Sequence, residues 1–112
     1  MHTDARPPRV SEAQFHARVR ARLQECPGAK SVSGPGRSGA VAAVYASHIL
    51  RVPFIPYGQR VPEALQPHLV IDTATMTGRT LRKAARKMGA HYTLAVYHTD
   101  RRHRFWYEEG EP

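Results

Sequence analysis

The sequence predicts an α/β fold, with a mostly parallel, twisted sheet of about five strands and helices on both faces. Short apolar segments alternate with segments of helical periodicity in the order β-α-β-β-α-β. Two loops that contain glycine each join an apolar strand to a helix, an arrangement typical of parallel sheets. No apolar run reaches the roughly 18 residues of a membrane-spanning helix, so we expect no membrane partner.

Length and composition indicate one domain. A chain of 112 residues that is 41% hydrophobic can bury one modest core. We expect a flexible arm over residues 1–10, a single domain over 11–107 and an acidic tail over 108–112. The lone cysteine, Cys26, allows no internal disulfide, and no signal peptide opens the chain. These features predict a cytoplasmic protein in which Cys26, beside Pro27 and Gly28, is structural.

The first half of the chain predicts two helices around a short strand. Ser11 and Gln14 have the spacing of a capping box, and Pro27 with Gly28 should end the first helix. Residues 30–33 predict a strand, followed by a helix capped by Ser38 and running to residue 50. Helical spacing predicts the following buried positions on these two helices: Phe15, Val19, Leu23, Val41, Val44, Tyr45 and Ile49.

The second half predicts four strands and one helix. The strands cover residues 54–56, 69–71, 91–97 and 103–107, and a loop with two prolines spans 57–67. The helix covers residues 80–88, and Gly89 provides its C-terminal cap.

The acid that follows the strand at residues 69–71 is the first candidate site residue. Asp72 is one of only two acids between Cys26 and Thr99, the other being Glu63. A carboxylate beside a buried strand is costly unless it is solvated, paired or metal-bound. The carboxyl end of a parallel strand, where ligands bind in such sheets, removes that cost.

The residues after Asp72 suit a phosphate group. Thr75, Thr77 and Thr80 offer hydroxyl donors, and Gly78 allows close approach of backbone N–H groups. The N-terminal end of the following helix attracts anions, and Arg79 adds a permanent positive charge.

A second anion loop precedes the other helix. Gly34, Gly36 and Gly39 spell G-x-G-x-x-G, but residues 54–59 lack the acid that a dinucleotide fingerprint would place there. A Walker A loop would require Gly-Lys-Ser or Gly-Lys-Thr, which is absent. These residues therefore predict a glycine-rich anion loop with Arg37 at its tip.

Residues 68–81 resemble the phosphoribosyl-pyrophosphate (PRPP) signature of the type I phosphoribosyltransferases, an apolar strand, an acid or acid pair, and Thr-Gly-x-Thr. The resemblance implies that Asp72 and Thr73 contact the ribose, and that Asp72 and Arg37 are catalytic. It implies that the 5′-phosphate is held by Thr75, Met76, Thr77, Gly78, Arg79 and Thr80. It implies that pyrophosphate is held by Gly36, Arg37, Ser38 and Gly39.

The same resemblance implies Mg²⁺ as a cofactor, held mainly by PRPP and water rather than by a protein metal site. Two positions depart from the family pattern. Thr73 stands where most members have a second acid, and Met76 stands where hypoxanthine–guanine enzymes carry an acid. The loop at 57–67, which in the enzymes closes over PRPP, is short.

The aromatic segment near the C-terminus permits two interpretations. Core packing is the default for Phe105, Trp106 and Tyr107. The resemblance also implies a base-stacking platform near the C-terminus, for which Trp106 is the candidate. The histidines at 98 and 103 are expected to be exposed loop residues rather than metal ligands.

These observations predict transfer of ribose 5-phosphate from PRPP to a nitrogenous base, with release of pyrophosphate. One alternative is a non-catalytic member that senses PRPP or a phosphorylated nucleotide. A second is a basic nucleic-acid-binding protein, because the net charge is +8. Under each of these interpretations we expect weak nonspecific binding to nucleic acid. A homo-oligomer is also compatible with the sequence. Arg18, Arg20 and Arg22 are expected to form a solvated helix face.

Overall fold

The computed structural model describes residues 8–75, 77–98 and 103–108, and its centre is a three-stranded parallel sheet. Strands β2 (Ser31–Ser33), β3 (His68–Thr75) and β4 (Tyr92–His98) lie in the order β2-β3-β4. The predicted strand at residues 54–56 is reduced to one parallel bridge between Phe54 and Val32. The sheet is therefore smaller than the five strands predicted, because its edge segment is too short to extend the ladder.

A separate two-stranded pair forms beside the main sheet. Strand β1 (Arg9–Val10) pairs in parallel with β5 (Arg104–Phe105). The prediction of a single strand over residues 103–107 is wrong, because the chain turns into the 3₁₀ helix η3 (Trp106–Glu108). The predicted arm at 1–10 is also partly ordered, since Val10 is buried. Residues 1–7 of the arm and 109–112 of the acidic tail lie outside the described residues.

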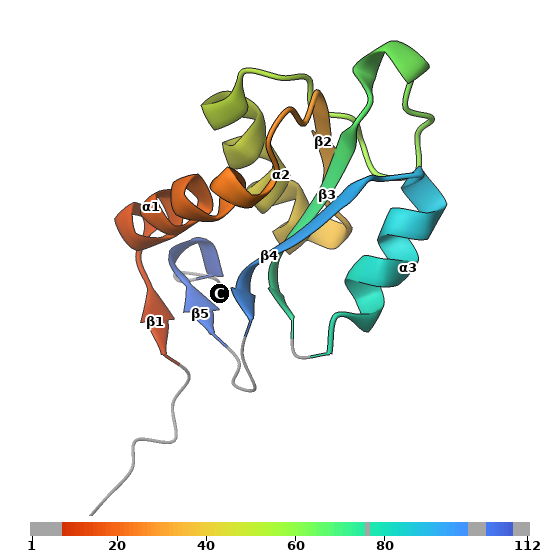
Figure 1. Cartoon of the computed structure of the whole chain (residues 1–112). Coiled ribbons are helices and arrows are strands. Elements are labelled where there is room, and N and C mark those ends of the chain that lie inside the picture. Colours follow the sequence, from red (N-terminus) through yellow and green to blue (C-terminus); the bar gives the residue numbers. More distant parts are fainter. Residues whose placement is uncertain (1–7, 76, 99–102, 109–112) are drawn as a thin grey trace, which may run out of the picture.

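Helices cover both faces of the sheet, as predicted. Helices α1 (Glu12–Arg22) and α2 (Gly36–Leu50) lie on one side, and α3 (Arg79–Met88) lies on the other (Figure 1). Two further 3₁₀ turns, η1 (Leu23–Glu25) and η2 (Glu63–Leu65), precede β2 and β3. Within the described ranges, no helix combines the length and apolar character needed to cross a membrane.

Helix α1 begins where the sequence predicts. The Ser11 hydroxyl accepts a hydrogen bond from the backbone N–H of Gln14, and the Gln14 side chain accepts one from the N–H of Ser11. Its predicted apolar stripe is confirmed, because Phe15 and Val19 are fully buried. This reciprocal cap typically stabilises a helix by about 1 kcal/mol.

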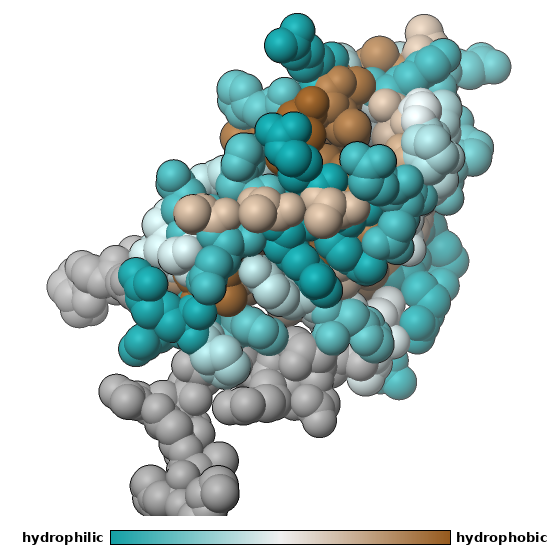
Figure 2. All heavy atoms as spheres, turned by 60° about the vertical axis from the view of Figure 1, so that its left-hand side comes forward, coloured by the Kyte–Doolittle hydropathy of each residue, from teal (hydrophilic) through white to brown (hydrophobic). Residues whose placement is uncertain are grey.

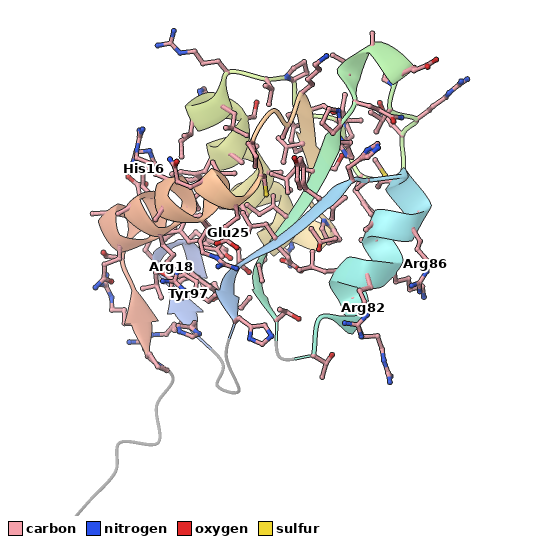
Figure 3. The ribbon with its side chains drawn as sticks, viewed as in Figure 1. His16, Arg18, Glu25, Arg82, Arg86 and Tyr97 are labelled. Carbon is pink, nitrogen blue, oxygen red and sulfur yellow. The ribbon has the colours of Figure 1, made fainter. Side chains whose placement is uncertain are left out.

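Arg18 and Arg20 of α1 are exposed, as predicted, and Arg22 is half-buried, but two of these three arginines also bind the sheet. The Arg18 Nε donates to the carbonyl of Val96 over 3.0 Å, and the Arg22 Nε donates to that of Ala95 over 3.1 Å. The Arg18 guanidinium also lies over the ring of Tyr97 (Figure 3). Helix α1 thereby covers the edge strand β4, whose unpaired polar groups would otherwise be exposed to pairing with another chain.

Helix α2 packs on the sheet most closely through small residues. Of the four larger side chains predicted to be buried, Val41, Tyr45 and Ile49 are half-buried against the core, and the prediction is wrong for Val44. Ala42, Ala43 and Ala46 are fully buried, whereas Val44 is 42% exposed. Alanines let the helix backbone approach the strands closely, so the bulkier residues lie at the flanks of the contact. On the side turned forward in Figure 2, hydrophilic side chains surround an apolar patch.

The core consists of two hydrophobic clusters separated by the sheet. Leu69 and Ile71 point into the cluster shared with α1 and α2, whereas Val70 points into the cluster beneath α3. Cys26 is buried at the first cluster, and burial raises the pKa of its thiol to about 11. The structural interpretation of Cys26 is confirmed, because a thiol with this pKa is not a ready nucleophile.

A buried polar ladder ties the loop between α2 and β3 to the sheet. His68 is fully buried, with Nδ1 2.6 Å from the Ser31 hydroxyl and Nε2 2.9 Å from the Ser33 hydroxyl. The two hydroxyls also reach the carbonyls of Leu65 and Ile55. Burial lowers the pKa of His68.

Acid should destabilise the protein through His68. Because the folded-state pKa lies below the ordinary value of 6.5, the unfolded chain binds the proton more readily. The contribution to stability is complete above pH 6.5 and declines as the pH falls towards the lowered folded-state pKa. Urea unfolding of the parent across this window should show the decline, and His68→Asn should reduce it. His48→Asn removes an exposed imidazole and should retain the parental dependence; equal slopes in all three proteins would contradict the assignment.

Candidate functional site

The two predicted anion loops open from neighbouring strands. Because β2 and β3 are parallel neighbours, their carboxyl ends lie at the same edge of the sheet. Helix α2 begins three residues after β2, and α3 begins four residues after β3. The positive N-terminal ends of both helices therefore belong to this edge, where an anionic ligand is stabilised.

The first loop is closed by direct contact between two glycines. A Cβ atom built on Gly34 would lie 1.8 Å from the carbonyl oxygen of Gly39, so no other residue fits without a backbone shift. Gly36 has a positive φ of 67° and starts α2, with Pro35 at the cap position. The prediction that Ser38 caps the helix is wrong, because the helix starts two residues earlier. Arg37 is exposed in the first helical turn.

Asp72 lies inside β3 rather than after it, which corrects the predicted strand end. The strand continues to Thr75, and Asp72 pairs in register with Ala95 of β4. Its half-buried carboxylate accepts a hydrogen bond from the backbone N–H of Thr73 over 2.7 Å. Burial raises the pKa of Asp72, and that hydrogen bond partly opposes the effect. Among the described residues no cation pairs with it, so the carboxylate keeps acceptor capacity for a ligand.

The threonines of the second loop are bound to the loop itself. The Thr75 hydroxyl accepts from the N–H of Gly78 over 2.7 Å, and the Thr77 hydroxyl accepts from the N–H of Arg79. Gly78 has a φ of 76° and occupies the cap position of α3. Thr75 and Thr77 thus fix the loop shape, which leaves Thr80, exposed in the first turn, as the freer hydroxyl. Met76 lies outside the described residues.

Tyr107 is the site residue that sequence reasoning missed. Its hydroxyl lies 2.8 Å from the Ser38 hydroxyl in the first anion loop. Burial raises the pKa of Tyr107, the hydrogen bond to Ser38 opposes this, and the negative charge of Glu108 adds to it. The Tyr107 side chain thereby connects the C-terminal segment to the first turn of α2. The sequence signal for this role was weak, because the contact between Tyr107 and Ser38 spans 69 positions of the chain.

Trp106 belongs to an aromatic cluster around α1. Its ring lies 5.2 Å from that of Phe15 and 5.9 Å from that of Tyr45, measured between centroids. Phe15 is fully buried, and Trp106 packs on the cluster that contains it. This position favours the core interpretation of Trp106.

The loop over residues 57–67, which contains η2, is held against α3. The N–H of Gly58 donates to the Met88 sulfur, and the Lys87 ammonium lies 5.0 Å from the centre of the Tyr57 ring. Within the part of the chain that the structure describes, no three His, Cys, Asp or Glu side chains gather closely enough to hold a metal ion.

Comparison with solved structures establishes the type of fold. The chain superposes on a purine phosphoribosyltransferase from Pyrococcus horikoshii with a TM-score of 0.66 and 19% identity, over 95% of this chain and 96% of that one. It superposes on a xanthine-guanine-hypoxanthine phosphoribosyltransferase from Helicobacter pylori with a TM-score of 0.70 and 12% identity, over 93% of both chains. The chain therefore has the phosphoribosyltransferase-type fold.

A third similar structure is a hypothetical protein from Neisseria gonorrhoeae with bound ppGpp. Its TM-score is 0.67 at 14% identity, with 98% of this chain and 93% of that chain covered. Neither a scan against protein-family models nor a search of curated proteins found a match.

The glycine contact predicts different outcomes for two alanine substitutions. Gly34→Ala should lower the free energy of unfolding by about 3 kcal/mol, because backbone at Gly39 must move. Gly36→Ala meets no atom within 4 Å and should cost only its left-handed strain, about 1–2 kcal/mol. Urea denaturation of both variants measures the two losses of unfolding free energy. Equal losses would show that Gly34 and Gly39 are not in contact.

Substitutions of the neighbouring residues Trp106 and Tyr107 should differ in their effect on stability. Trp106→Ala should destabilise the fold by roughly 3 kcal/mol, since it opens a cavity against Phe15 and Tyr45. Tyr107→Phe removes one hydroxyl and should cost about 1 kcal/mol. Thermal and urea unfolding measure both losses. A Trp106→Ala variant of parental stability would place this ring outside the core.

Proposed function

We propose that this protein binds PRPP with Mg²⁺ and transfers its ribose 5-phosphate to a nitrogenous base, releasing pyrophosphate. The observation that carries the proposal is the convergence of two helix N-termini on one sheet edge that also holds the half-buried carboxylate of Asp72. A ligand with phosphate at both ends of a ribose matches two anion sites with a hydroxyl acceptor between them.

Each group in the site would act through position and charge. Asp72 would accept hydrogen bonds from the ribose hydroxyls, while the N-terminus of α3 and the Thr80 hydroxyl would hold the 5′-phosphate. The N-terminus of α2 and Arg37 would hold pyrophosphate, and the fixed charge of Arg37 would stabilise the leaving group as the bond breaks. Catalysis would then consist mainly of orientation and electrostatic stabilisation.

The residues present fit a magnesium ion that arrives with the substrate. Mg²⁺ prefers oxygen ligands and is commonly bound through one or two carboxylates together with substrate phosphates. Asp72 supplies one such carboxylate near the predicted phosphate sites. When bound, the ion would neutralise charge on the departing pyrophosphate.

A second candidate function is the sensing of PRPP or a phosphorylated nucleotide without transfer. Two observations favour it. The second acid of the family pattern is replaced by Thr73, which is buried. One similar solved structure, from Neisseria gonorrhoeae, contains bound ppGpp.

Binding of PRPP should depend on Asp72. Calorimetric titration with PRPP and Mg²⁺ should give saturable binding to the parent, weakened in Asp72→Asn by about 1.5–3 kcal/mol, the scale of hydrogen bonds to a charged group. Glu63→Gln removes an exposed acid from η2 and is the matched control, with parental affinity expected. Unchanged affinity in Asp72→Asn would remove this residue from the site.

Release of pyrophosphate then separates the two candidate functions. Transfer requires release when PRPP is mixed with a suitable purine, pyrimidine or related base. Saturable PRPP binding without release across such a panel would favour the sensing role.

A further inference from the structure

The solvent side of α3 carries a concentrated set of positive charges. At about 100° per residue, the five cations of this helix lie within an arc of about 140°, and all five are exposed. They are Arg79, Arg82, Lys83, Arg86 and Lys87, which we call the α3 basic face. The opposite side of the helix, with Leu81, Ala84 and Met88, is buried in the core. Figure 3 shows Arg82 and Arg86 directed away from the sheet.

Among the residues that the structure describes, no ion pair joins this face to an acid. In the sequence, Asp72 is the one acid between residues 64 and 98. The contacts that the structure gives these five side chains are the bond from Arg82 to the carbonyl of Thr77 and the approach of Lys87 to the Tyr57 ring. Like charges three and four residues apart repel, and Arg79 also stands at the positive end of the helix dipole. An anionic partner would relieve this repulsion.

The chemistry of the face indicates which polyanion fits. A membrane-binding helix inserts its apolar side into lipid, but the apolar side of α3 is already covered by the sheet. Among the described residues, the exposed large hydrophobic side chain is Val44, which belongs to α2 on the other side of the sheet. The face extends along a helix of about 15 Å, the axial span of about four phosphates on one nucleic-acid strand.

We propose that the α3 basic face is a docking surface for the phosphate backbone of nucleic acid. The proposed binding is independent of sequence, because the cationic side chains of this face would contact phosphate oxygens, which carry no sequence information. Docking of nucleic acid on this face is separate from the proposed transfer of ribose 5-phosphate, although α3 begins at the predicted 5′-phosphate loop. Arg79 and Arg82 contact or belong to that loop, so the test uses residues further along the helix.

The experiment compares two pairs of charge removals. Lys83→Gln with Arg86→Gln removes one lysine and one arginine from the face, and Arg20→Gln with Lys30→Gln removes the same charges from α1 and from the residue before β2. All four side chains are exposed. Fluorescence anisotropy with labelled single-stranded and duplex DNA, measured over a range of salt concentrations, gives the slope of log affinity against log salt.

The α3 pair should lower the steepness of that slope by about 1.4 for single strands and about 1.8 for duplex, the release of counterions from two phosphate contacts. The control pair should leave the slope near the parental value. Equal changes in both pairs would overturn the proposal, since they would indicate general charge attraction. Binding of anionic lipid vesicles or an acidic peptide that depends on α3 more strongly than DNA binding does would overturn it as well.

A further measurement keeps this result separate from the proposed function. The Lys83→Gln, Arg86→Gln variant should retain parental PRPP titration, because neither residue belongs to the predicted phosphate loops. A loss of PRPP binding together with DNA binding would overturn the assignment of a distinct surface. A loss of DNA binding alone, whether or not the parent binds PRPP, supports it.

Discussion

The pairing of β3 with a parallel neighbour on each side is the constraint on which this structure depends. Leu69, Val70 and Ile71 are fully buried, and they feed both core clusters because alternate side chains point to opposite faces. The pairing with β2 brings the two glycine loops to one edge, and the pairing with β4 extends β3 past Asp72. The ladder around His68 adds to this by fixing the preceding loop to β2. The same strand, β3, thus contributes to both core clusters and positions the candidate site.

Local sequence signals predicted those features that local chemistry determines. The cap at Ser11, the αL residue at Gly89 and the apolar stripe through Phe15 each depend on a few neighbouring residues, and each was predicted correctly. The strand-loop-helix order around Asp72 also follows from its own segment. The end of β3 does not, because residues beyond Asp72 remain in the strand through pairing with Tyr97 and His98, about 23 positions away. Strand length here is decided by the partner strand.

Features that depend on distant contacts escaped sequence reasoning for the same reason. Tyr107 reaches Ser38 across 69 positions, and Arg18 reaches Val96 across 78. Neither residue type indicates such a distant partner, because tyrosine is common in cores and arginine is common on helix surfaces. The alanine face of α2 was missed because hydrophobicity favours large side chains, whereas close packing of a helix on a sheet favours small ones. Contact across the fold, rather than composition, assigns these residues their roles.

The positively charged side chains of the protein fall into groups with different roles. Arg18 and Arg22 donate hydrogen bonds to backbone carbonyls of β4, so they help to cover this edge strand. The cations of α3 lie in a stretch of sequence, residues 64–98, whose one acid is Asp72, and Asp72 lies within β3. A phosphate ligand at the N-terminus of α3 would meet the first of those cations and the helix dipole together. Under the two proposals, the positive charge of α3 would therefore serve phosphate binding twice, at the loop before the helix and along its exposed face.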